Sequence, residues 1–187
     1  KDCGQYDTVT EVMWVTGAAL FIRLADYREV GGLDGHFFAH MEEIDLCWRL
    51  RSRGKKLVCI PQSVVYHVGG ATLKKENPRK TFLNFRNNLL MLYKNLPDKE
   101  LEHVLFIRGI LDRVAALVFY LKKDRANARA VMQARREFED IRYSFAASRI
   151  ENMMKSTDEI IPERTHFSIV MKYYLLGKKH FSQLKLF

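Results

Sequence analysis

The chain has 187 residues, of which 48% are hydrophobic and 28% are charged. These are ordinary globular values that exclude a disordered or fibrous protein, and the length allows one domain with a real core or a compact half with an appendage. The formal charge of +9, from 31 Lys and Arg against 22 Asp and Glu, predicts attraction to anionic partners such as nucleotide phosphates, nucleic acid or acidic lipid surfaces.

The cysteines and the start of the chain indicate where the protein works. Cys3, Cys47 and Cys59 lack zinc-like pairing, and the latter two lie in apolar runs, which favours reduced, packed thiols in a cytosolic protein. We find no secretory signal and no uninterrupted apolar stretch of transmembrane length. Because Lys1 leads almost at once into a strand-like run, we expect the sequence to be a piece of a longer protein.

The first expected elements are separated by glycines. Residues 9–22, rich in Val, Trp, Thr and Phe, indicate a strand that breaks at Gly17 and continues as buried chain. Gly17 is either a plain turn or a point where another group approaches the backbone closely. Residues 24–30 are typical of a short helix, which Gly31 and Gly32 end in the manner of a C-terminal cap.

A second helix is expected over residues 42–53, after an aromatic turn at 33–38 and before Gly54. Its apolar residues cover two neighbouring faces, so we expect it to be mostly buried. Beyond it, residues 55–60 and 63–67 predict two short strands or one interrupted strand.

The residue pattern predicts that the rest of the chain is helical. Pro78, directly after Asn77, suits the first turn of a helix, and apolar residues recur at helical spacing up to Pro97. Two further helices are expected, over residues 99–122 and 124–155.

Three carboxylates crowd the start of the second helix, at Glu42, Glu43 and Asp45. A structural explanation is available, because acidic side chains are favoured at a helix N-terminus and Asp45 can form an ion pair with Arg49 four residues on. The alternative is functional, since clustered carboxylates serve as general bases and metal ligands, and the aromatic turn before them would raise a carboxylate pKa.

His67 ends the last predicted strand, before the Gly69–Gly70 loop. It is either a strand-end histidine bonded to backbone or a neutral imidazole suited to a divalent metal. The residue pattern leaves both open.

Five stretches follow one another in a set order: TGAALFIR at 16–23, EVGGLDGHFF at 29–38, EEIDLCWRLRSRG at 42–54, IPQSVVYHVGG at 60–70 and FRNNLLML at 85–92. Together they resemble the C-terminal half of family 2 glycosyltransferases, and most closely the bacterial rhamnosyltransferase-like members that build surface polysaccharides. The resemblance covers residues 12 to about 95.

The resemblance implies a helix-rich, mixed α/β chain. It would be the C-terminal part of a GT-A fold, with a few short strands followed by an all-helical extension. Residues 1–96 would then form the acceptor-side part of the catalytic domain and residues 97–187 the helical extension.

The resemblance also implies an inverting transfer of a sugar from a nucleotide-diphospho-sugar to a saccharide or lipid-linked saccharide. Glu43 matches the family's base, with Glu42 beside it. His67 matches the histidine that helps to hold a divalent metal, Mg²⁺ or Mn²⁺, on the diphosphate. Four residues match the acceptor side: Gly17, Ala18, Asp34 and Asp45.

The sequence departs from the family at three points. Glu43 stands where an Asp is usual, so the choice of base between Glu42 and Glu43 stays open, and Gly35 replaces a common Glu. The donor-binding half with its Asp-x-Asp metal motif has no counterpart in these residues. We therefore expect the 187 residues alone to be inactive.

The basic, amphipathic rear half indicates a peripheral contact with the inner face of the cytoplasmic membrane, or simply a solvated helical face. A different class of function, a non-catalytic helical module that binds a membrane surface or nucleic acid, is the alternative. We expect no nucleic acid, because the basic residues are dispersed among acids. A degenerate transferase kept for scaffolding is a further alternative.

Overall fold

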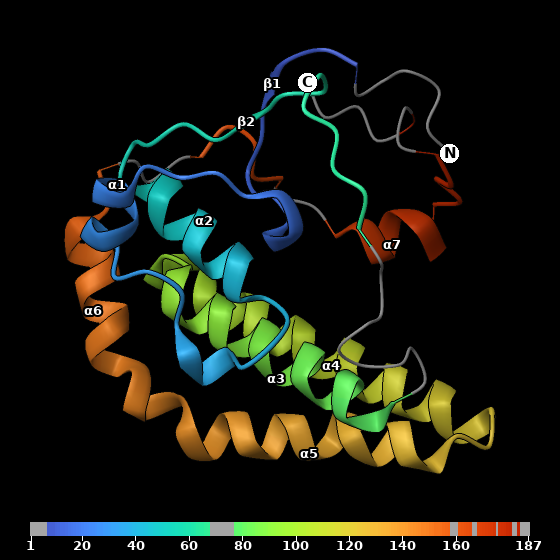
Figure 1. Cartoon of the computed structure of the whole chain (residues 1–187). Coiled ribbons are helices and arrows are strands. Elements are labelled where there is room, and N and C mark those ends of the chain that lie inside the picture. The colour runs from blue at the N-terminus through green and yellow to red at the C-terminus, as the bar shows by residue number, and fades with distance from the viewer. Residues whose placement is uncertain are drawn as a thin grey trace.

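In a computed structural model of the protein, the structure describes residues 7–67, 77–157, 161–165, 168–174, 176–180 and 183. Short helices and strands make up the N-terminal part, and long helices make up the rest (Figure 1). The elements are β1 (Thr10–Glu11), η1 (Gly17–Ala19), α1 (Leu24–Glu29), η2 (Gly35–Phe37), α2 (Glu42–Ser52), β2 (Val58–Cys59), α3 (Pro78–Asn95), α4 (Asp98–Leu121), α5 (Arg125–Ile141), η3 (Arg142–Phe145), α6 (Ala146–Lys155) and α7 (Ile169–Tyr174). This agrees with the predicted helix-rich mixture of helices and strands.

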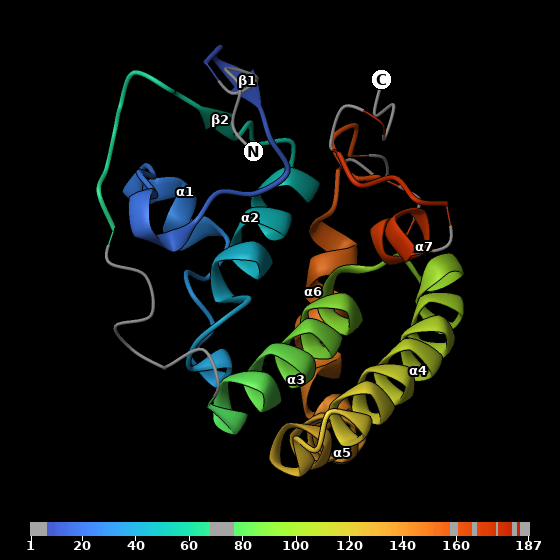
Figure 2. The same cartoon turned by 90° about the vertical axis from the view of Figure 1, so that its right-hand side faces the viewer.

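Helix α3 is the centre of the molecule. Its start is fixed as expected, because the Asn77 side chain accepts a hydrogen bond from the Arg79 N–H at 2.9 Å and Pro78 occupies the first turn. From there α3 packs against α2, α4, α5 and α6, so it joins the N-terminal part to the helical part (Figure 2). The predicted division at residues 96 and 97 falls directly after α3 and stays a prediction.

The main hydrophobic core lies where α3 meets its neighbours. Leu89, Leu90 and Tyr93 from α3 pack with Phe138 of α5 and with Phe37, which is fully buried. Burying a large apolar side chain in this way contributes about 1.5–3 kcal/mol. Phe37 therefore fastens the aromatic turn before α2 to the helical part.

A smaller core holds α1 against α2. Val30, Leu46 and Leu50 are buried together. The chain between them turns through Gly31 and Gly32, both at positive φ, which confirms the predicted glycine cap after α1.

The strands are much shorter than predicted. Among the described residues, the sheet consists of β1 and β2 alone, paired antiparallel with Thr10 opposite Cys59 and Glu11 opposite Val58. Residues 63–67 are not a strand and are exposed. Strand-forming residues need neighbouring strands to pack on, and the described ranges contain no third strand for this pair.

The helix predicted over residues 124–155 is wrong as one element. It ends at Ile141, passes through the 3-10 turn η3 and resumes as α6. Phe138, near the end of α5, and Phe145, the last residue of η3, are both buried in the main core. The bend lets both rings enter that core, while α6 packs against the C-terminal end of α3, where Asn152 donates to the Lys94 carbonyl (Figure 1).

The thiols also differ from expectation. Cys47 is buried as predicted, but Cys59 is exposed because both residues of β2 face solvent. Cys3 lies outside the described residues. Within the part of the chain that the structure describes, none of the helices combines the length and hydropathy needed to cross a bilayer.

We expect Gly32→Ala to destabilise the protein more than Gly31→Ala. Both substitutions place an alanine at positive φ, at a cost of about 1 kcal/mol. Only the first would also put a Cβ at 2.9 Å from the ring of Tyr27, whereas Gly31 has open space. Urea unfolding measures both, with Gly35→Ala, which has neither positive φ nor a close neighbour, as the control.

Candidate active site

The acidic start of α2 follows a backbone of unusual conformation. Met41, the residue before the helix, has φ 75° and provides no side-chain cap. The first turn instead carries the three predicted carboxylates, Glu42, Glu43 and Asp45. Their negative charge is favoured there by the helix dipole, but their surroundings differ sharply.

Glu42 and Glu43 are half-buried and incompletely paired. The Oε2 atom of each is buried and accepts no hydrogen bond from the residues that the structure describes. Burial, and then the charge of Glu43, raise the pKa of Glu42, although its own backbone N–H opposes the shift. Unpaired buried carboxylate oxygens are costly, so this pair can accept a proton or a hydrogen bond from a ligand.

The segment that contains Gly17, a predicted acceptor-binding residue, lies against the face of α2 that carries Glu43. A Cβ added to Gly17 would lie 3.7 Å from the Glu43 Cβ. Burial raises the pKa of Cys47, one helical turn further on, and the backbone of Val15 opposes this shift through a hydrogen bond. Val15 and Gly17 therefore lie along this face of α2, so the structure brings Gly17 beside Glu43, and Ala18 follows it in the same exposed 3-10 turn.

In contrast to Glu42 and Glu43, Asp45 has hydrogen-bond partners on both carboxylate oxygens. Its side chain is fully buried, and Oδ2 receives hydrogen bonds from Arg49 Nε at 3.0 Å and Nη2 at 2.8 Å. Lys94 Nζ lies 2.9 Å from the same oxygen, and Asn95 donates to Oδ1 at 2.8 Å. The predicted ion pair with Arg49 is confirmed, and the geometry gives Asp45 a packing role without an exposed oxygen for an acceptor.

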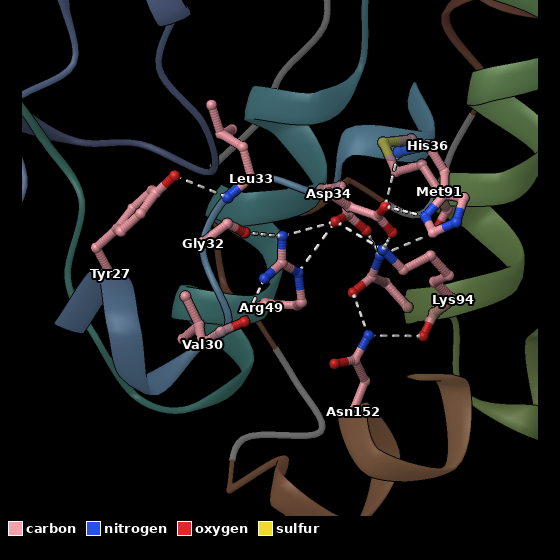
Figure 3. A network of polar contacts seen from close by, with 12 residues as sticks. Tyr27, Val30, Gly32, Leu33, Asp34, His36, Arg49, Met91, Lys94 and Asn152 are labelled. Carbon is pink, nitrogen blue, oxygen red and sulfur yellow. Dashed lines mark hydrogen bonds and ion pairs between the residues drawn. The ribbon is translucent and has the colours of Figure 1, made fainter. Parts of the chain in front are cut away.

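Arg49 carries this network to the glycine turn after α1 (Figure 3). Its guanidinium donates to the carbonyls of Val30 and Gly32, the latter at 2.8 Å. On the other side, Lys94 Nζ lies 2.7 Å from Asp34 Oδ2. The cluster thus balances two cations with two carboxylates and has no net charge; its members are Arg49, Lys94, Asp34 and Asp45. Charge balance of this kind lowers the free-energy cost of burying ions.

Asp34 lies apart from Glu43. It lines a groove of about 770 Å³ between the turn before α2 and the start of α6, together with His36, Ser148 and Asn152. Glu42 and Glu43 are not among the residues that line it. The predicted acceptor residues are therefore divided between two surfaces, with Gly17 and Ala18 on one and Asp34 on the other.

Asn87 holds the turn that leads into the acidic helix. It is fully buried on α3, and its amide nitrogen lies 2.8 Å from the carbonyls of Phe37, Ala39 and His40. This turn needs support, because Phe38, His40 and Met41 all have positive φ, at about 1 kcal/mol or more each for residues with a Cβ. One amide thus fixes the backbone from which Glu42 and Glu43 project.

His67 is exposed at the end of a described range, and residues 68–76 after it, with the Gly69–Gly70 loop, lie outside the described residues. Among the residues that are described, no three His, Cys, Asp or Glu side chains are grouped closely enough to hold a metal ion. His67 is a suitable metal ligand but makes no metal site by itself. Its role stays a prediction.

Sequence reasoning missed the residues that α3 contributes, Asn87, Lys94 and Asn95. All three are buried. A signal was present, because Asn87 and Lys94 fall at helical spacing with Leu83 and Leu90, and Asn95 lies four residues after the buried Met91. Polar residues on an apolar stripe indicate buried partners elsewhere in the chain.

Comparison with known proteins shows similarity to glycosyltransferases. The chain is 31% identical over 141 residues to the pre-mycofactocin glycosyltransferase of Mycobacterium tuberculosis, covering 70% of this chain and 29% of that protein. It is 38% identical over 56 residues, 30% of this chain and 18% of the relative, to the N-acetylglucosaminyl-diphospho-decaprenol L-rhamnosyltransferase of the same species. The rhamnosyltransferase WbbL of Escherichia coli K12 is 36% identical over 61 residues, 33% of this chain and 22% of WbbL.

The chain therefore spans less than a third of the length of these curated relatives. No protein-family model and no solved structure matches it. The similarities support a glycosyl-transfer function in general, which agrees with the predicted resemblance at that level.

We expect Asn87→Ala to lower the free energy of unfolding by about 2–3 kcal/mol, because three carbonyls of the turn lose their buried donor. Chemical denaturation measures the change. Asn88→Ala is the matched control, since Asn88 is half-buried on the same helix, and it should change stability by less than about 0.5 kcal/mol. Equal effects of the two substitutions would contradict the role of Asn87.

The stability contribution of Asp34 should depend on pH. Burial opposes ionisation, but Lys94 and His36 together lower the pKa of Asp34 from 3.8 to about 2. Because the folded state has the lower pKa, its carboxylate stabilises the fold fully above about pH 4, and this stabilisation is lost as pH falls towards 2. The contribution is about 2 kcal/mol or less, after allowance for solvent screening.

The measurement compares wild type with Asp34→Asn in urea at pH 7, 4, 3 and 2. The difference in unfolding free energy should be constant above pH 4 and shrink below it. Asp140→Asn, at an exposed position, should follow wild type at every pH. A difference between wild type and Asp34→Asn that stays constant down to pH 2 would refute the assignment.

Proposed function

We propose that the chain is the acceptor-side part of an inverting, GT-A-type glycosyltransferase of family 2. The observation that carries the proposal is the pair of buried, unpaired oxygens on Glu42 and Glu43 beside the Gly17 segment. They occur in a chain that is similar to glycosyltransferases. A buried carboxylate without a partner, next to open backbone, is the arrangement that a general base for a hydroxyl group requires.

In the proposed reaction, Glu43 accepts the proton of an acceptor hydroxyl. The hydroxyl oxygen then forms a bond to the anomeric carbon of the donor sugar, while the bond from that carbon to the nucleoside diphosphate breaks on the opposite face. The configuration at the carbon is thereby inverted. Glu42 lies next to the base, and either of the two carboxylates could take the proton on sequence grounds, so both are tested below.

Gly17 and Ala18 are proposed to line the acceptor beside Glu43. Asp34 and Asp45 were predicted on the same side of the site, and we propose a different task for them on the basis of their network. Through Lys94 and Arg49 they hold the turn before α2 in place. We propose that they position the site without touching the acceptor.

The donor nucleotide is proposed to bind to a part of the enzyme outside these residues. The exposed apolar side chains around β1 and β2 support this, among them Trp14, Val58, Ile60 and Tyr66. A two-stranded sheet is marginal alone, and an apolar surface of this kind marks a contact. A divalent metal, Mg²⁺ or Mn²⁺, would neutralise charge on the leaving diphosphate, with His67 as one contributor to its binding.

The acceptor is proposed to be a saccharide or a lipid-linked saccharide used in surface polysaccharide synthesis. Support comes from the name of one relative, an N-acetylglucosaminyl-diphospho-decaprenol L-rhamnosyltransferase. A lipid-linked acceptor would place the protein in the cytoplasm, at the inner face of the membrane. Peripheral membrane contact is therefore part of the proposal.

We expect Glu43→Gln, made in the longer protein that contains this chain, to lower kcat for sugar transfer by about 10²–10⁴-fold, because the hydroxyl loses its base. Glu42→Gln should have a smaller effect. Product formation from nucleotide-sugar and acceptor is followed by chromatography, and anomeric configuration by NMR. The control is Glu102→Gln at an exposed position on α4.

Unchanged turnover with Glu43→Gln would remove Glu43 as the base, and a large loss with Glu42→Gln alone would transfer that role to Glu42. If the longer protein itself transfers no sugar, the chain is a degenerate transferase or an interaction module, and if it is active but neither substitution matters, another group is the base. The 187 residues alone should transfer no sugar, and measurable transfer by them would contradict the separate donor-binding part.

A further inference from the structure

Helix α4 exposes a continuous apolar stripe. Phe106, Ile110, Val114, Leu117 and Leu121 follow one another at spacings of four, four, three and four residues, which places them on one face of the helix. Each is between 50% and 70% exposed. Single exposed apolar residues are ordinary, but a contiguous row of this length marks a contact surface.

Unneutralised arginines border this stripe. Arg125, Arg129 and Arg136 of α5 line a groove of about 770 Å³ together with Leu117 and Met132, and none of the described residues that line it is acidic. Arg125 lies over the ring of Tyr120. Neither Arg129 nor Arg136 forms an ion pair with a described residue. The surface therefore combines exposed hydrocarbon with free positive charge.

The opposite face of α4 is fixed to the protein. Asp112 is buried and lies between Arg108 Nη2 at 2.8 Å and Arg135 Nη1 at 2.9 Å. This ion triad joins α4 to α5. As a result α4 cannot turn its polar side outward, and the apolar stripe stays on the surface of the folded protein.

We propose that the stripe on α4 and the arginines of α5 dock the protein onto the surface of an anionic lipid bilayer. The helix lies flat, its apolar side chains enter the boundary between headgroups and acyl chains, and the arginines contact lipid phosphates. The proposal rests on the proposed function in one respect, because it assigns a surface to the membrane contact included there. Binding to the bilayer does not itself require sugar transfer.

Charge argues against a second copy of the chain as the occupant. A two-fold pair brings the same patch of each subunit together, so Arg129 and Arg136 would face a second arginine set without acidic partners. A second possible occupant of the stripe is the rest of the enzyme. The exposed apolar side chains around β1 and β2 offer it a better contact, and they lie on the far side of the molecule from α4 (Figure 2). An anionic bilayer satisfies both the hydrocarbon and the arginines.

The test is co-sedimentation of the 187-residue chain with vesicles of phosphatidylcholine alone or mixed with phosphatidylglycerol, without any nucleotide-sugar. Wild type should bind the anionic vesicles, and less so at high salt. Ile110→Asp with Val114→Asp should weaken binding by about tenfold or more, because charges cannot enter the bilayer boundary. The matched control is Ile150→Asp with Met154→Asp, an equally spaced, exposed pair on α6, which should bind as wild type.

The contribution of the arginine charges is tested with the double variant Arg129→Gln and Arg136→Gln, which should bind anionic vesicles about tenfold more weakly than wild type. Lys178→Gln with Lys179→Gln, an exposed pair near the end of the chain, should have no such effect. Circular dichroism verifies that each variant is folded, and Ile110→Ser replaces the aspartate pair if that pair unfolds.

Three results would overturn the proposal: no binding by wild type, equal loss in the α6 control, or binding that depends on the two lysines alone. A concentration-dependent dimer in ultracentrifugation that Ile110→Asp with Val114→Asp abolishes, without vesicle binding, would identify a protein interface instead. Because no sugar transfer is measured, failure of the proposed reaction leaves this result intact.

Discussion

The buried carboxylate of Asp45 is the constraint on which the rest of the site depends. Its bonds to Arg49, Lys94 and Asn95 join α2, α3 and the glycine turn in one cluster. Such a cluster adds little net stability compared with apolar packing, but removal of one partner costs about 3–5 kcal/mol, so it fixes one arrangement against others. Residues two apart on a helix project in nearly opposite directions. By holding Asp45 inward, the cluster turns Glu43 outward to the Gly17 segment.

The sequence was informative wherever the signal was local. The helix cap at Gly31 and Gly32, the start of α3 at Pro78 and the pairing of Asp45 with Arg49 all involve neighbours along the chain, and each is present. The short sheet could not be foreseen in the same way. An apolar, strand-like run shows only that a segment favours an extended, partly buried conformation. The length of the strand that forms depends on which neighbouring strands are available to pair with it.

The candidate site was predictable only in part for the same reason. Glu42 and Glu43 were found from their crowding, and the raised pKa of Glu42 follows from burial that the aromatic turn suggested. Asn87 and Lys94 were not found, because they act on residues about fifty positions earlier. Helix α3 is accordingly part of the site's framework, although it carries none of the predicted site residues.

The positive-φ turn before α2 has a consequence for how the protein forms. Phe38, His40 and Met41 hold conformations that their own side chains disfavour, and the amide that stabilises them belongs to a helix fifty residues further along the chain. During synthesis, α2 leaves the ribosome well before α3 is available. We infer that the two glutamates reach their final positions late, when α3 docks, so that a nascent chain stopped before Asn87 would hold the residues of the site without its shape.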